Sequence, residues 1–188
     1  KNTFNTNCVV CNSGTSALHL SLIANNIGPG DEVICPDYTF AATWNSVVYT
    51  GAKPVFADVL EDTWCVDPKS IKALINKKTR AIITVDLFGN PCDYKEILNI
   101  CKDYNLVLIQ DSAESLGSKY DNKSIFNLGS ISCTSFNMNK IITAAGGGAV
   151  FSDDKDTLKK VKNYINQSKK LNSYDYDDIG YNYRMGTV

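Results

Sequence analysis

Residues 106–117 read LVLIQDSAESLG, a continuous apolar run that ends in a carboxylate followed by small polar residues. A short run of this kind, apolar on both faces, is typical of a strand buried inside a parallel sheet. Ligands bind at the carboxyl ends of parallel strands, because the loops that follow these strands converge at one edge of the sheet. We therefore expect Asp111, which ends this strand, to lie at a binding edge.

Strand-like and helix-like segments alternate in both directions from this run, separated by turn signals such as GPGD at 28–31. The pattern predicts an α/β fold, a mostly parallel sheet with helices on both faces, in a single domain. The expected strands are 8–11, 32–35, 54–59, 81–85, 106–109, 130–136 and 148–152, and the expected helices are 14–25, 39–50, 67–76, 94–104 and 156–165.

Length and charge narrow the class of protein. A chain of 188 residues can build one well-packed core but not two ordinary domains. Its net charge of −1, without a basic cluster, argues against binding to nucleic acid or to an anionic membrane. No apolar run approaches bilayer length and residues 1–5 are polar, so we expect a cytoplasmic protein without a signal peptide. The first residue is not methionine, which indicates that the sequence begins inside a longer chain.

The cysteines and the single histidine do not predict a metal site. Seven scattered cysteines are unlike a secreted disulfide framework. Cys8 and Cys11 form a C-x-x-C, but they lie in an expected strand, where residues three apart point to opposite faces. His19 is the only histidine. We expect reduced, mostly buried thiols and no metal.

Two of four notable clusters lie next to expected strands in the first two thirds of the chain. Residues 12–17, NSGTSA, join a strand to a helix, and the N–H groups of such a helix start attract phosphate. The same residues could merely cap the helix. Asp111 could hold a proton on a heteroaromatic nitrogen by charge pairing, or it could cap the next turn.

The other two clusters follow the strand expected at 130–136. In SFNMNK, residues 135–140, the apolar side chains around Lys140 would desolvate it and favour the neutral amine that forms Schiff bases; a solvated surface lysine is the alternative. These flanking residues are Phe136, Met138, Ile141 and Ile142. In AAGGGA, residues 144–149, three glycines predict either a close backbone approach or a simple hairpin turn.

Taken in chain order, these clusters resemble the DegT/DnrJ/EryC1/StrS family of aminotransferases, which act on nucleotide-linked keto sugars. The resemblance runs from about Asn12 to Met185. The stretches that carry it are NSGTSAL (12–18), GPGDEVI (28–34), DLFGNP (86–91), QDSAESLG (110–117), SFNMNK (135–140) with its glycine run, and GYNYRM (180–185).

The resemblance implies the large domain of an aspartate aminotransferase-like, fold type I transferase that uses pyridoxal phosphate. Lys140 would carry the cofactor as a Schiff base and move the proton during transamination. Asp111 would pair with the pyridine nitrogen, Glu114 would contact the ring hydroxyl, and Phe40 would stack on the ring. Thr15, Ser16 and Ser135 would hold the phosphate, and Asn182 would reach the phosphate of the neighbouring cofactor in a homodimer with shared active sites. The implied reaction transfers an amino group, with glutamate as donor, to a nucleotide-linked 4-keto-6-deoxy sugar.

The sequence departs from the family pattern in length. Family members are nearly twice as long and carry a small C-terminal domain, whereas residues 186–188, GTV, end this chain. Residues 1–188 would thus be a large domain that lacks the start and the small domain of its parent, either excised or truncated. A catalytically incomplete or regulatory member therefore stays an alternative. A sugar dehydratase that uses pyridoxamine phosphate would carry histidine in place of Lys140, and a dinucleotide-binding domain would need a G-x-G-x-x-G that residues 13–16 do not supply.

Overall fold

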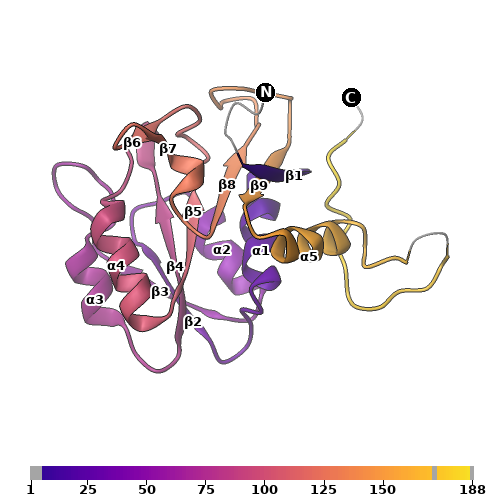
Figure 1. Cartoon of the computed structure of the whole chain (residues 1–188), viewed down its shortest axis with the longest axis horizontal. Helices are drawn as coiled ribbons and strands as arrows, with labels where there is room; N and C mark the ends of the chain where they lie inside the picture. The colour runs from indigo at the N-terminus through magenta and orange to yellow at the C-terminus, as the bar shows by residue number, and fades with distance from the viewer. Residues whose placement is uncertain (1–5, 171–172, 187–188) are drawn as a thin grey trace.

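A seven-stranded sheet forms the centre of the molecule in the computed structural model, which describes residues 6–170 and 173–186 (Figure 1). Its strand order is β1-β9-β8-β5-β4-β2-β3. The strands are β1 (Asn7–Cys11), β2 (Glu32–Pro36), β3 (Lys53–Ala57), β4 (Thr79–Val85), β5 (Val107–Asp111), β8 (Ile131–Ser135) and β9 (Gly148–Ser152). The neighbours from β8 to β3 pair in parallel, whereas β9 runs antiparallel to both β8 and β1. The prediction of a mostly parallel sheet is therefore confirmed.

Helices cover both faces of this sheet, as predicted (Figure 1). They are α1 (Gly14–Ala24), α2 (Ala42–Tyr49), α3 (Pro68–Leu74), α4 (Tyr94–Tyr104) and α5 (Lys155–Ile165). One buried core joins α1, α2 and α5 to the sheet and contains Leu18, Val47 and Val161. A second core joins α3 and α4 to the opposite face and contains Ile71 and Ile97.

The helix starts show how far local signals determine these elements. The Ser13 side chain caps α1 by accepting a hydrogen bond from the backbone N–H of Ser16, at 3.0 Å. Helix α2 begins at Ala42, three residues later than predicted, because the chain bends at residues 37–39 and becomes helical only after Phe40 and Ala41. It ends before Gly51, whose φ of +81° is a backbone conformation that glycine adopts readily. That termination agrees with the prediction.

Several short elements were not predicted. A two-stranded ribbon of β6 (Lys119–Tyr120) and β7 (Lys123–Ser124) comes after β5 in the chain. The 3₁₀ turns are η1 (Leu87–Gly89), after β4, and η2 (Ile125–Asn127), after β7. Asp121 and Asn122 join the ribbon with positive φ angles of 49° and 62°. Such a pair is typical of tight hairpin turns and is the signal that could have predicted the ribbon.

The cysteines are free thiols, and all but Cys8 are buried. This confirms the expectation of mostly buried thiols, and the exposed Cys8 and buried Cys11 face opposite sides of β1 as the strand period requires. Within residues 6–170 and 173–186, no group of three or more histidine, cysteine or acidic side chains could hold a metal ion. No helix in the same part of the chain is long and apolar enough to cross a membrane.

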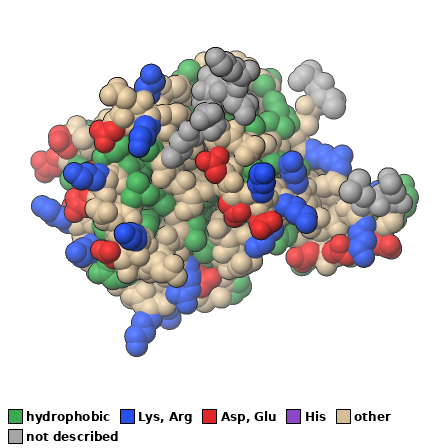
Figure 2. Space-filling view, viewed as in Figure 1, with side chains coloured by type: hydrophobic (Ala, Val, Ile, Leu, Met, Phe, Trp, Pro, Cys, Tyr) green, Lys and Arg blue, Asp and Glu red, His purple; other side chains and the backbone are tan. Residues whose placement is uncertain are grey.

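Acidic and basic side chains intermix over the face drawn in Figure 2. That distribution agrees with the small net charge and creates no field of one sign on this face. Residues 1–5 and 187–188, which entered the expectations about the two ends of the chain, lie outside the described residues.

Candidate active site

A cavity of about 340 Å³ opens at the carboxyl ends of the parallel strands. Asp111 and Ser135, the last residues of β5 and β8, both line this cavity. The start of α1 contributes Thr15, the loop after β8 contributes Lys140, and the glycine run contributes Gly147. The four clusters singled out in the sequence therefore meet around one space, at the edge where a parallel sheet binds its ligands.

Asp111 is a buried carboxylate on the wall of this cavity, with 6% of its surface exposed. Burial raises its pKa to about 6, although two hydrogen bonds and the charge of Lys140 act in the opposite direction. The Thr43 hydroxyl donates to Asp111 Oδ2 at 2.9 Å, and the Ala113 N–H donates to Oδ1 at 3.3 Å. The second bond shows that Asp111 also caps the turn after β5. A cation bound beside it would stabilise the ionised form, as a protonated heteroaromatic nitrogen does.

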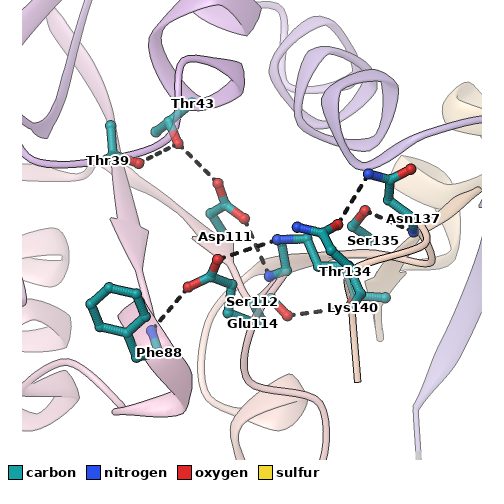
Figure 3. Close-up of polar contacts among 12 residues, drawn as sticks. Thr39, Thr43, Phe88, Asp111, Ser112, Glu114, Thr134, Ser135, Asn137 and Lys140 are labelled. Carbon is teal, nitrogen blue, oxygen red and sulfur yellow. Dashed lines mark hydrogen bonds and ion pairs between the residues drawn. The ribbon is translucent and has the colours of Figure 1, made fainter. Parts of the chain in front are cut away.

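Lys140 lies on the turn that follows β8, where its backbone N–H donates to the carbonyl of Asn137 at 3.0 Å. Its ammonium pairs with Glu114 Oε1 at 3.3 Å, and only 16% of the Lys140 side chain is exposed (Figure 3). The amine is thus largely removed from bulk solvent among the residues that line the cavity.

The prediction that apolar sequence neighbours surround the Lys140 amine is wrong. Met138, Ile141 and Ile142 are exposed at 76%, 62% and 57%, so they point into solvent and do not cover the amine. Phe136 is partly buried and packs against a small separate core that contains Ile125 and Ala149. Side chains of successive residues in a turn diverge, so closeness in sequence did not predict closeness in space.

Glu114 connects Lys140 to the η1 turn. Its Oε2 accepts a hydrogen bond from the backbone N–H of Phe88 at 3.0 Å, while Oε1 pairs with Lys140 (Figure 3). Phe88 has a φ of +52°, an unusual value for an aromatic residue, and its backbone is held by this carboxylate. Sequence reasoning missed both Phe88 and Thr43, because neither carries a local signal for its distant partner.

The start of α1 faces the cavity through Ser13, Gly14 and Thr15. A Cβ on Gly14 would lie 2.9 Å from the Cβ of Ser135, so the missing side chain allows the Ser135 hydroxyl to approach the helix start. A helix N-terminus beside a hydroxyl donor is a favourable site for a phosphate. Ser16 is buried behind this surface, where its hydroxyl accepts from the Ser13 hydroxyl at 3.0 Å.

The glycine run makes the close backbone approach that its composition predicted. A Cβ on Gly148 would lie only 2.5 Å from the carbonyl oxygen of Ser13, which brings the run against the start of α1. The run also leads into β9, which pairs antiparallel with β8, but the long segment 136–147 joins the two strands, so the connection is not a simple hairpin turn.

Phe40 and Asn182 occupy different places relative to the cavity. Phe40 lines it and is 77% exposed, which leaves its ring available to a flat ligand. Asn182 is exposed and is not among the residues that line the cavity. Its backbone carbonyl lies 3.5 Å from the side-chain nitrogen of Asn12, which does line the cavity.

The sheet order, the helices on both faces and the cavity with a lysine and a buried aspartate define the large domain of an aspartate aminotransferase-like, fold type I transferase. Within this class, the chain belongs to the DegT/DnrJ/EryC1/StrS aminotransferase family, whose model matches residues 3–188.

Three known proteins illustrate the similarity. The chain is 43% identical over 177 residues to GDP-perosamine synthase of Escherichia coli O157:H7, covering 94% of this chain and 49% of that protein. It is 38% identical over 182 residues to UDP-2-acetamido-2-deoxy-3-oxo-D-glucuronate aminotransferase of Pseudomonas aeruginosa, covering 96% and 50%. Bacillus subtilis NtdA, solved with its cofactor PMP bound, matches at 30% identity and a TM-score of 0.91, covering 97% of this chain and 42% of that one. The chain spans about half the length of the curated relatives it matches.

Pyridoxal phosphate is the cofactor of this family, and the residues of the cavity fit its chemical groups. The buried Asp111 suits a protonated ring nitrogen, and the α1 start with Ser135 suits a phosphate. Phe40 offers a ring face, and Lys140 places a primary amine in the same space.

Proposed function

We propose that the full-length protein uses pyridoxal phosphate to transfer an amino group to a nucleotide-linked keto sugar. The observation that carries this proposal is the meeting of the Lys140 amine, the buried Asp111 carboxylate and the Ser135 hydroxyl around one cavity. The names of two relatives, one a GDP-linked and one a UDP-linked sugar enzyme, support the class of acceptor.

Each residue has a role that follows from its position. Lys140 would hold the cofactor covalently and, once displaced by the amino donor, move a proton between donor carbon and cofactor. Asp111 would keep the ring nitrogen protonated, and Glu114 would hold the freed Lys140 amine in the cavity and contact the ring hydroxyl. Pyridoxal phosphate, when bound, supplies an electron sink for the negative charge that develops on the substrate carbon.

The remaining contacts would position the cofactor. The Phe40 ring would stack on it, and the Thr15 and Ser135 side chains with the first N–H groups of α1 would bind its phosphate. Ser16 would support this phosphate site from behind, because it is buried against the Ser13 cap.

For the two substrates, we propose glutamate as the amino donor and a 4-keto-6-deoxy sugar as the acceptor. Both come from the family resemblance. The intact Lys140 argues against a dehydratase, which carries histidine at that position. We further propose a cytoplasmic homodimer in which Asn182 reaches the cofactor phosphate of the neighbouring subunit, because Asn182 is exposed and lies outside the cavity of its own chain.

A turnover assay tests the function. Full-length protein with pyridoxal phosphate and glutamate should aminate at least one member of a panel of GDP- and UDP-linked keto sugars. Lys140→Ala should lower kcat by about 1000-fold or more, because both the anchor and the proton carrier are lost. Lys159→Ala, an exposed lysine of α5, is the matched control and should keep normal turnover. Wild-type-like turnover in Lys140→Ala would refute the assigned role.

A further inference from the structure

We propose that the side-chain amides of Asn137 and Asn139 bind hydroxyl groups of the sugar acceptor. This inference rests on the proposed function and assigns a substrate-binding role to two residues outside the cofactor contacts described above.

Both asparagines lie on the turn that carries Lys140, and both line the cavity while remaining exposed. The turn is closed by the bond from the Lys140 N–H to the Asn137 carbonyl, at 3.0 Å. The Asn137 N–H also lies 3.4 Å from the Ser135 hydroxyl oxygen, which it faces as a donor (Figure 3). The two amides are therefore carried by the same turn as the reactive amine and line the same cavity.

The two amides orient each other. Asn137 Nδ2 donates to Asn139 Oδ1 at 3.1 Å, which leaves Asn137 Oδ1 as an acceptor and Asn139 Nδ2 as a donor. Within the described part of the chain, neither of these atoms has another hydrogen-bond partner. Turning both amides over exchanges the roles of the residues but leaves the same one acceptor and one donor available. A sugar hydroxyl both donates and accepts, so it matches this pair.

The experiment separates the two half-reactions in the full-length protein. Glutamate first converts the cofactor in the absence of sugar, and the acceptor, a GDP-linked 4-keto-6-deoxy hexose, is then added. Asn137→Ala and Asn139→Ala should each raise the KM for the sugar by about three- to tenfold, the effect of losing one hydrogen bond. Both variants should keep the glutamate half-reaction within about twofold of wild type, because the amides do not touch the donor. Asn163→Ala, an exposed asparagine of α5, should change neither half-reaction.

Two outcomes would overturn the inference. Equal slowing of both half-reactions would mean that the amides only shape the Lys140 turn. An unchanged sugar KM in both variants would mean that they do not contact the acceptor. A wild-type protein that completes the glutamate half-reaction but aminates no nucleotide sugar would refute the proposed function as well, which distinguishes the two failures.

Discussion

Asp111 is a carboxylate that the fold buries away from water, and no cationic side chain in residues 6–170 or 173–186 forms an ion pair with it. Its raised pKa, about 6 against an ordinary 3.8, means that the folded protein without cofactor holds the Asp111 proton more tightly than the unfolded chain does. The stability of that form therefore falls as the pH rises from about 4 to 6, where the unfolded chain has lost this proton and the native state gives it up. A protonated pyridine ring bound beside Asp111 would stabilise the ionised carboxylate and offset this loss of stability.

The affinity for pyridoxal phosphate should depend on pH through this group. In the full-length protein the affinity should fall as the pH drops below about 6, because Asp111 takes up a proton and can no longer pair with the ring nitrogen. A fluorescence titration at several pH values measures this. Asp111→Asn is the matched control, since it keeps the shape and leaves only the titration of the cofactor phosphate, whose second pKa is also about 6.

The Asp111→Asn variant also tests whether turnover depends on the charge of this side chain or only on its shape. Asp111→Asn should still bind the cofactor but lose most turnover, because a neutral amide does not favour the ring cation. Near-normal turnover would show that Asp111 serves only as the cap of the turn through Ala113.

At the scale of helices and strands, the sequence predicted those helix starts that depend on capping residues next to them in the chain. Ser13 caps the start of α1, and Asp67 followed by proline caps the start of α3. The start of α2 was wrong because periodicity alone does not define where a helix begins. There the Thr39 and Thr43 hydroxyls, 2.7 Å apart, and the bond from Thr43 to Asp111 organise the bend before the helix.

The loop after β5 shows what the sequence could not predict. Ser112 and Ser115 both donate to the buried carboxylate of Asp86, and Ser118 donates to the carbonyl of Gly89. These bonds anchor the loop to η1 and set the position of Glu114, but each joins residues more than 25 positions apart. No local pattern carries information about such pairs.

His19 on α1 is buried against tyrosine side chains. It is 2% exposed, lies edge-on to the rings of Tyr181 and Tyr183, and its Nδ1 is 3.3 Å from the Tyr183 hydroxyl. Burial lowers its pKa to about 4, so the ring is neutral near pH 7. The contact holds the segment that contains Asn182 against α1.

At the scale of the whole molecule, the cavity depends on the order of the strands, which the sequence pattern did not provide. The lining residues extend from Asn12 to Gly147 and come together because β1, β9, β8 and β5 are neighbours in the sheet. The fold class could be predicted from motifs and the family resemblance, and so could most of the predicted residues that line the cavity. The direction of their side chains could not, as the exposed neighbours of Lys140 show.

Exposed apolar side chains near the cavity predict how the proposed homodimer forms. Phe88 is 78% exposed, and with Met138, Ile141 and Ile142 it presents apolar surface close to residues that line the cavity. Ile141→Asp should shift full-length protein from dimer toward monomer in analytical ultracentrifugation, because a buried charge disfavours association. Tyr104→Asp, at the far end of α4, is the control and should leave the dimer intact. A monomeric wild type, or an Ile141→Asp variant as dimeric as wild type, would contradict this interface.

Covalent attachment of the cofactor to Lys140 is the claim on which the proposed function depends. Full-length protein is mixed with pyridoxal phosphate, reduced with borohydride, digested and mapped by mass spectrometry. The cavity geometry predicts that the pyridoxyl group is found on the peptide that contains Lys140, and that Lys140→Ala shows no such adduct at any single site. A stoichiometric adduct on a different lysine, together with continued transamination by Lys140→Ala, would contradict the assignment.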